Sequence, residues 1–255
     1  MHIRQKTTWL NQPAPPVDQT GGSMSKPKLH AVPAPCPNRG ECLKRTATFV
    51  ILGNICSRNC RFCAVNKGRP EPLDLQEPER VVSAVKNLKL NHVVLVSASR
   101  DDLPDGGAGL FTACMDQLRV QSPQTTQEVV VPDFAGSREA LYSVTSMRPD
   151  LLNHNIETVP RLFSKIRPEA DYRRSLKVLS DAAQSTTCKS GLMLGMGETR
   201  NEVIEVLRDL LDSGVAAVTI GQYLQPSARH LPVVEYVPPE AYEELELIGR
   251  EMGFA

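Results

Sequence analysis

From about residue 43 the chain alternates short apolar runs with amphipathic stretches, and this alternation constrains its fold more than any other feature. The pattern predicts strands over 46–53, 92–98, 128–134, 152–158, 191–195 and 216–224. It predicts helices over 78–90, 108–120, 137–147, 172–184, 201–211 and 239–252. Strands that alternate with helices form parallel sheets, because each helix carries the chain back to the start of the next strand. Right-handed units in this number curl into a barrel or part of one, so we expect an α/β fold built as a partial, TIM-like (β/α)6 barrel.

One helix boundary is marked with particular clarity. Thr199 and Glu202 have the spacing of a capping box and precede an amphipathic run, which predicts a helix start at this point. Gly214 is the expected stop.

The first part of the chain, residues 1–42, has the composition of an irregular arm. Seven prolines between Pro13 and Pro37, together with Gly21 and Gly22, disfavour regular structure. The arm is expected either to be a disordered lead or to wrap the body, with Trp9 as an anchor for the second arrangement. We therefore divide the chain into this arm and a barrel over 43–255.

The charge balance excludes some classes of function. Lys and Arg number 29 and Asp and Glu also number 29, and no long basic run occurs, so we expect no nucleic-acid partner. No apolar run approaches the roughly 18 residues needed to span a bilayer, so we expect no membrane partner. Residues 1–12 lack the apolar core of a signal peptide. Exposed thiolates require a reducing compartment, so a cytoplasmic location is expected.

Cys56, Cys60 and Cys63 form the pattern C-x3-C-x2-C directly after the first predicted strand. Iron–sulfur clusters are usually held by four thiolates. A loop with three thiolates would leave one iron of a cubane open to a small molecule. The active sites of such barrels lie at the C-terminal ends of the strands, which is where this loop falls.

Other interpretations of the cysteines are weaker. Zinc sites usually combine a C-x2-C pair with a second pair or with histidines, and the nearest histidines are His30 and His92. A disulfide framework fits poorly because the seven cysteines are odd in number and the chain is long. Phe62 is either a wall for a planar ligand such as adenine beside the open iron or a packing residue.

Polar residues after the second predicted strand are candidates for ligand binding. The segment begins at Ser97, and Arg100 could bind a carboxylate while Asp101 or Asp102 binds an ammonium group. The same segment is equally typical of a solvated surface loop.

The later strand ends carry further candidates. Asn153 and Glu157 lie at the fourth strand, where a glutamate could accept hydrogen bonds from ribose hydroxyls. Lys189, Gly195 and Glu198 lie at the fifth, and its glycines would let the backbone approach a ligand closely.

The cysteine pattern, with Phe62 before its last member, resembles the signature of radical S-adenosylmethionine enzymes. The run Gly191-x-x-x-Gly195-x-x-Glu198 is similar to their motif on the adenine side of the fifth strand. More specifically, the chain resembles the lipoyl synthase family from about Trp9 to its last residue. The matching blocks are 36–42, 46–53, 67–70, 100–103, 131–134, 153–157, 189–193 and 221–227.

The resemblance implies a radical S-adenosylmethionine barrel and a sulfurtransferase of lipoate biosynthesis. A [4Fe–4S] cluster on Cys56, Cys60 and Cys63 would bind S-adenosylmethionine and cleave it to a 5′-deoxyadenosyl radical. That radical would remove hydrogen from C6 and C8 of an octanoyl chain, and a second, auxiliary [4Fe–4S] cluster would supply the sulfur. The implied partners are an octanoylated lipoyl-domain protein, either a 2-oxoacid dehydrogenase E2 or a glycine cleavage H protein, and an electron donor such as ferredoxin or flavodoxin.

The chain departs from the family pattern at the auxiliary cluster. Cys36 and Cys42 keep the C-x5-C part, but Ala31 stands where the family has another cysteine. The chain ends at Ala255 before the C-terminal serine segment of the family. Cys114 and Cys188 are possible substitutes, although each is more simply a buried small apolar residue. The open alternatives are a truncated lipoyl synthase, a divergent paralogue without the sulfur-donor cluster, and a non-catalytic metal-stabilised binding barrel.

Overall fold

The computed structural model describes residues 45–255, so the predicted arm and the candidate ligands Cys36 and Cys42 lie outside the described residues. Its main sheet has six parallel strands in the order β1-β4-β5-β6-β7-β8. The strands are β1 (Thr46–Ile51), β4 (His92–Ser97), β5 (Thr126–Val130), β6 (Leu151–Asn153), β7 (Cys188–Leu194) and β8 (Val215–Gln222). Each new strand is added beside the one before it, which is the arrangement of a partial barrel.

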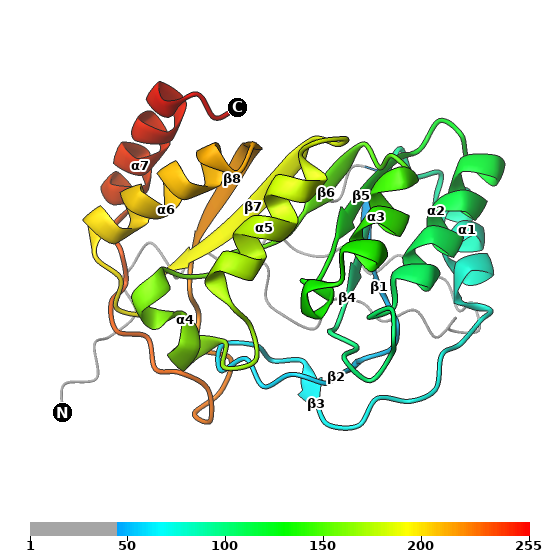
Figure 1. Cartoon of the computed structure of the whole chain (residues 1–255), viewed down its shortest axis with the longest axis horizontal. Helices are drawn as coiled ribbons and strands as arrows, with labels where there is room; N and C mark the ends of the chain where they lie inside the picture. The colour runs from blue at the N-terminus through cyan, green and yellow to red at the C-terminus, as the bar shows by residue number, and fades with distance from the viewer. Residues whose placement is uncertain (1–44) are drawn as a thin grey trace.

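The helices are α1 (Glu77–Leu88), α2 (Ala108–Gln121), α3 (Arg138–Ser146), α4 (Pro160–Ile166), α5 (Tyr172–Ala182), α6 (Arg200–Asp212) and α7 (Pro239–Met252). Right-handed crossovers between neighbouring parallel strands place the connecting helices on one face of the sheet (Figure 1). All six predicted strands and all six predicted helices are present, with shifted ends. Helix α4 and a two-stranded ladder of β2 (Ile55–Cys56) and β3 (Asn66–Lys67) were not predicted.

The predicted start and stop of α6 are confirmed. The hydroxyl of Thr199 accepts from the backbone N–H of Glu202, whose carboxylate accepts from the backbone N–H of Thr199. Gly214 has a φ of +79°, a conformation that residues with a Cβ rarely adopt, so the helix ends there.

Two strands are shorter than the sequence predicts at their C-terminal ends. β5 ends at Val130, because Asp133 accepts a hydrogen bond from Ala135 and starts a 3-10 turn over Phe134–Gly136. β6 ends at Asn153, and the chain returns to the sheet only at Glu157, which forms an isolated bridge with Leu192. The polar residues that follow these two strands therefore lie outside the hydrogen-bonded sheet.

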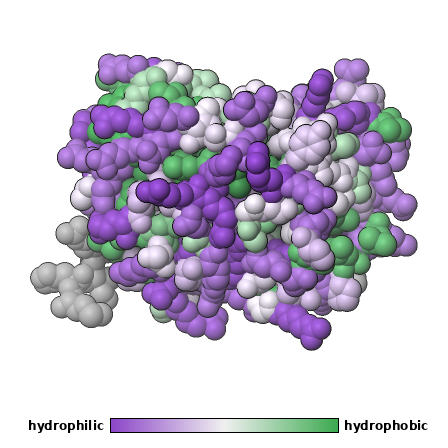
Figure 2. Space-filling view, in the orientation of Figure 1, coloured by the Kyte–Doolittle hydropathy of each residue, from purple (hydrophilic) through white to green (hydrophobic). Residues whose placement is uncertain are grey.

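The core lies between the sheet and the helices. Val85 of α1, Leu118 of α2 and Leu207 of α6 are buried against strand residues such as Leu95 and Leu152. Burial of each such side chain contributes about 1.5–3 kcal/mol. Hydrophilic residues cover much of the face seen in Figure 2. Within the described part of the chain, none of the helices is both long and apolar enough to span a membrane.

Candidate functional site

A cavity of about 610 Å³ lies at the C-terminal ends of the strands. Its wall combines the cysteine loop with the ends of β1, β4, β5 and β6. Six of the residues predicted for the site line it: Cys56, Phe62, Cys60, Cys63, Ser97 and Glu157. The structure therefore brings together the cysteine loop with residues from strands far away in the sequence.

Backbone contacts hold the loop in place at both ends. Cys56 pairs with Lys67 in the β2–β3 ladder, and Ser57 donates from its backbone N–H to the Ser99 carbonyl at 3.0 Å. Arg61 donates from its backbone N–H to the Ile166 carbonyl at 2.9 Å. These contacts keep the loop over the cavity.

Each thiol has a distinct electrostatic setting. Burial raises the pKa of Cys60, an effect that the nearby Arg167 opposes. Burial also raises the pKa of Cys63. A backbone N–H, that of Arg58, points at the sulfur of Cys56 with an N···S distance of 3.4 Å. The positive guanidinium beside Cys60 favours the thiolate form that metals bind.

The donor set fits an iron–sulfur cluster better than a single ion. Among residues 45–255, no three His, Cys, Asp or Glu side chains are arranged to hold one metal ion. A cubane does not require three sulfurs to converge on one atom, because each thiolate binds a different iron. Cys56, Cys60 and Cys63 line a cavity with room for a cluster and a further ligand, so these residues would hold the cluster.

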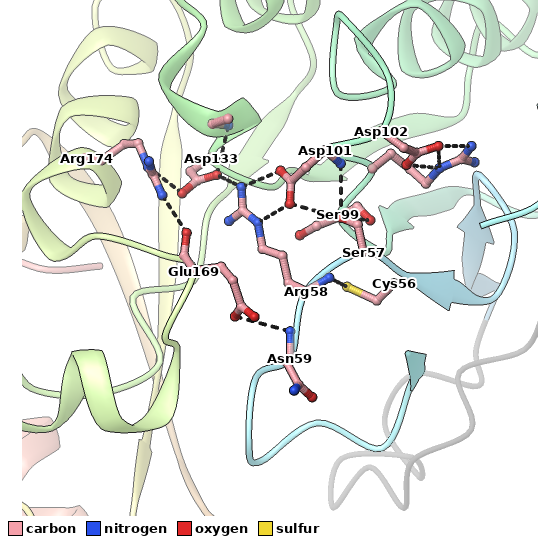
Figure 3. Close-up of polar contacts among 12 residues, drawn as sticks. Cys56, Ser57, Arg58, Asn59, Ser99, Asp101, Asp102, Asp133, Glu169 and Arg174 are labelled. Carbon is pink, nitrogen blue, oxygen red and sulfur yellow. Dashed lines mark hydrogen bonds and ion pairs between the residues drawn. The ribbon is translucent and has the colours of Figure 1, made fainter. Parts of the chain in front are cut away.

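A network of ion pairs around the buried Arg58 anchors the cysteine loop to the rest of the barrel (Figure 3). The guanidinium of Arg58, only 3% exposed, binds Asp101 at 2.7 Å and Asp133 at 2.5 Å. Asp133 is completely buried and also binds Arg174 of α5 at 2.7 Å. The network links the cysteine loop to the segments after β4 and β5 and to α5.

The network determines the charge state of its central carboxylate. Burial alone would raise the pKa of Asp133, but the hydrogen bond and charge of Arg58 and the charge of Arg174 lower it to about 2. Asp133 is therefore ionised at neutral pH. A buried carboxylate of this kind needs its cations, because an unpaired buried charge is strongly destabilising.

Several buried polar atoms around the cavity have no partner. The atoms Ser97 Oγ, His154 Nε2 and Asn155 Oδ1 are buried and form no hydrogen bond with any described residue. All three residues line the cavity. Buried polar atoms usually have partners, so these three atoms leave unused hydrogen-bonding capacity in residues beside the cavity.

The protonation state of His154 follows from its contacts. Its Nδ1 lies 2.9 Å from the Val131 carbonyl, which can only accept, so Nδ1 carries the proton and Nε2 is an acceptor. Burial, together with the charge of Arg167, lowers the pKa of His154 to about 4. The neutral imidazole therefore has a buried acceptor nitrogen, Nε2, in a residue that lines the cavity.

Glu157 has an unusual backbone conformation. Its φ is +68°, in the left-handed region, and hydrogen bonds to β7 hold it there: its N–H donates to Gly191 and its carbonyl accepts from Met193. Burial raises the pKa of Glu157, while Arg167 and Asn155 oppose the rise. A left-handed glutamate carries strain of about 1–3 kcal/mol, and strained residues of this kind cluster at functional sites.

Arg100 and Asp101 do not line the cavity. The Arg100 guanidinium is 3% exposed and donates to Asp102, to the Leu52 carbonyl and to the Glu71 carbonyl. Asp101 binds Arg58, whose hydrogen bond lowers the pKa of this carboxyl. Arg100, Asp101 and Asp102 therefore connect loops of the chain to one another. Their charges are paired and do not face a bound amino acid.

Of the residues predicted at the later strands, Glu157 lines the cavity, but Asn153, Lys189, Gly195 and Glu198 do not. Asn153 lies within the sheet, paired with Lys189, and the ammonium of Lys189 binds Glu128 at 2.8 Å. The carboxylate of Glu198 accepts from the backbone N–H groups of Gly195 and Met196, so it closes the turn after β7.

Cys114 and Cys188 do not belong to the site. Both are completely buried in the hydrophobic core, and Cys188 lies at the start of β7, at the opposite end of the sheet from the cavity. Burial raises the pKa of each thiol to about 12. Their interpretation as small core residues is confirmed.

Sequence reasoning missed Arg58, His154, Asn155 and Arg167. His154 and Asn155 lie between the two predicted residues Asn153 and Glu157, so the polar run itself was the available signal. Arg58 lies between two cysteines, but its partners Asp101 and Asp133 come from distant segments. No local pattern marks Arg167.

The Radical SAM superfamily matches residues 50–210 of this chain. The chain is 54% identical to a lipoyl synthase of Caldanaerobacter subterraneus subsp. tengcongensis, over 87% of this chain and 79% of that protein. It is 49% identical to a lipoyl synthase of Nitrosococcus oceani, over 98% of this chain and 81% of that protein.

Solved structures of low sequence identity share the fold. HydG, a maturase of the [FeFe]-hydrogenase, superposes with a TM-score of 0.65 at 15% identity, over 82% of this chain and 49% of that one. Methylornithine synthase (PylB) superposes with a TM-score of 0.62 at 14% identity, over 81% of this chain and 62% of that one. The predicted α/β fold is confirmed as that of these enzymes. The chain has its cysteine loop at the strand ends, and about half of its residues are identical to those of lipoyl synthases over most of its length. It therefore belongs to the lipoyl synthase family of the radical SAM superfamily.

Proposed function

We propose that this chain inserts sulfur at C6 and C8 of a protein-bound octanoyl chain by radical chemistry. One observation carries the proposal: three thiols from a single loop line a cavity at the carboxyl ends of four strands, in a chain of the lipoyl synthase family. A bound [4Fe–4S] cluster and S-adenosylmethionine supply the 5′-deoxyadenosyl radical there.

The residues of the chain have separate tasks in this proposal. Cys56, Cys60 and Cys63 hold the cluster, and the charge of Arg167 favours the thiolate form of Cys60. His154 and Glu157 offer acceptors to the hydroxyl and amino groups of S-adenosylmethionine. Phe62 lines the same cavity and provides an apolar wall. Shielding by the cavity wall matters because a primary carbon radical removes hydrogen from almost any group it meets.

The partners follow from the substrate. The octanoyl chain would be carried on a lysine of a lipoyl domain, either in a 2-oxoacid dehydrogenase E2 or in a glycine cleavage H protein. Ferredoxin or flavodoxin would supply electrons. Cys36 and Cys42 would contribute to the auxiliary cluster that donates the sulfur, and a cytoplasmic location follows from the need to keep the thiols reduced.

The deciding measurement is iron and acid-labile sulfide per chain after anaerobic reconstitution. About eight of each indicates two cubanes and supports sulfur insertion. About four of each indicates the radical cluster alone and favours a paralogue without a sulfur donor. Zinc without sulfide would contradict the radical assignment altogether.

A matched pair of variants tests the role of the loop. Cys60→Ala should abolish formation of 5′-deoxyadenosine from S-adenosylmethionine and lower the iron content, while the barrel stays folded. Cys188→Ala, a core position, should retain both properties. If Cys60→Ala still cleaves S-adenosylmethionine, the loop does not hold the cluster.

A further inference from the structure

A second hollow lies on the outer side of the cysteine loop, with a volume of about 1260 Å³. It runs between the 54–71 segment, which contains β2 and β3, and the 229–232 segment before α7, and Figure 1 shows these segments along the same edge of the molecule. We call it the basic groove. Its charged and titratable lining residues are Arg61, Lys67, Arg69, Glu71, Arg229 and His230.

The groove has an excess of positive charge that the residues of the described part of the chain do not neutralise. Arg61, Arg69 and Arg229 are exposed, and none of the three forms an ion pair with any described residue. The nearby Arg80, in contrast, binds Asp74 at 2.7 Å. Glu71 is the one carboxylate among the described residues that line the groove, and the exposed Glu169 lies nearby, where it accepts from the backbone N–H of Asn59 (Figure 3).

The groove touches the peptide units of the cluster cysteines. The Lys67 ammonium donates to the Cys60 carbonyl at 2.6 Å. The Nε2 of His230 lies 3.1 Å from the Cys63 carbonyl. Lys67 and its neighbour Asn66 line both the groove and the cavity, so one thin wall separates the two.

We propose that the basic groove is the docking site for an acidic one-electron donor protein. The inference rests on the proposed function, because reductive cleavage of S-adenosylmethionine consumes one electron per molecule. In the docked complex the donor is oxidised by one electron, the cluster on the other side of the wall is reduced by one electron, and no covalent bond forms or breaks between the proteins. Positive charge at the groove steers an acidic partner to this place and speeds association.

The groove fits a protein better than a nucleic acid. The formal net charge of the whole chain is zero, which gives no long-range attraction for a polyanion. No Phe, Tyr or Trp side chain is among the described residues that line the groove, so bases would lack the large aromatic rings on which they usually stack.

The test uses the full, reconstituted chain and reduced flavodoxin, an acidic flavoprotein, as the probe. The variant is Arg61→Glu with Arg69→Glu. The matched control is Arg208→Glu, an exposed arginine on α6 without an ion pair to any described residue. Stopped-flow absorbance follows cluster reduction by flavodoxin or by dithionite, and titration measures flavodoxin binding at low and high salt.

The double variant should lower the association rate with flavodoxin by about tenfold or more and flatten its salt dependence. Reduction by dithionite should be unchanged, because a small reductant needs no docking surface. The Arg208→Glu control should behave like the wild type in every measurement.

Two outcomes would overturn the proposal. One is an unchanged rate of reduction by flavodoxin with unchanged salt dependence. The other is normal reduction by flavodoxin together with loss of binding to an octanoylated lipoyl domain, which would assign the groove to the carrier. Failure of the proposed function appears differently: the wild type would then form no 5′-deoxyadenosine even with dithionite, while flavodoxin binding would still report on the groove.

Discussion

The guanidinium of Arg58 donates a 2.5 Å hydrogen bond to the carboxylate of Asp133, across 75 residues of sequence. Arg58 lies in the cysteine loop, and Asp133 follows the carboxyl end of β5. The side chains of both are almost completely shielded from water. This pair therefore fixes the cysteine loop against the barrel. Solvent has almost no access to either side chain, so water cannot take over the hydrogen bond.

We expect Arg58→Gln to destabilise the fold and to reduce iron incorporation. The substitution removes two ion pairs and leaves the buried Asp133 with Arg174 alone. Breaking a buried pair in this way costs about 3–5 kcal/mol. Chemical unfolding and iron analysis of the reconstituted chain measure the two effects.

Arg250→Gln is the control for Arg58→Gln, because it breaks an exposed pair with Glu246 in α7. Such pairs contribute little, so neither the free energy of unfolding nor the iron content should change measurably. Equal losses in both variants would show that burial of the Arg58 network has no special role.

His154 should make stability depend on pH in a defined range. Burial lowers its pKa from 6.5 to about 4, so the folded chain favours the neutral imidazole. That stabilisation is fully present above pH 6.5 and is lost as the pH falls toward 4, because the unfolded chain takes up the proton first. The effect is on the order of 3 kcal/mol.

The check for His154 is a series of unfolding curves across this pH range, for the wild type and His154→Gln. The glutamine amide can donate to the Val131 carbonyl but does not titrate. As the pH is lowered, the free energy of unfolding of His154→Gln should fall less steeply than that of the wild type. Parallel curves would show that His154 does not contribute to the pH dependence.

Glu157→Ala should weaken binding of S-adenosylmethionine more than assembly of the cluster. The carboxylate lines the cavity but is not a ligand of the cluster in our assignment. Loss of a hydrogen bond to a charged acceptor costs about 1.5–3 kcal/mol, or roughly ten- to hundredfold in affinity. Equilibrium binding and iron content are measured side by side, and an unchanged affinity removes Glu157 from the binding site.

Gly195→Ala should destabilise the turn after β7. Gly195 has a φ of +102°, and an added Cβ would overlap the backbone oxygen of Glu235. Strain of this kind costs about 1–3 kcal/mol. Gly221→Ala in β8 is the control, since nothing lies within 4 Å of its added Cβ. Thermal unfolding distinguishes the two, and similar melting temperatures would contradict the proposed strain.

The order of strands and helices and the position of the cysteine loop could be predicted from the sequence. Periodicity and caps are local properties, and the capping box at Thr199 acts within four residues of the chain. The spacing of Cys56, Cys60 and Cys63 is local too, and it follows a strand whose end lies on the functional side of a parallel sheet.

The partners of charged residues could not be predicted in this way. Arg100 and Asp101 have the composition of a binding loop, yet Arg100 is held by Asp102 and backbone carbonyls, and Asp101 is held by Arg58. Whether a charge meets a ligand or another side chain depends on which segments the fold brings together. That information is spread over the whole chain.

The sequence by itself therefore determined the class of fold and the position of the three-cysteine loop, since both depend on residues close together along the chain. Only the tertiary structure decided that His154 presents an acceptor nitrogen and that Arg58 is buried between Asp101 and Asp133. The physical reason is that burial and charge pairing act through space. They arise only when strands separated by tens of residues place their ends around one cavity.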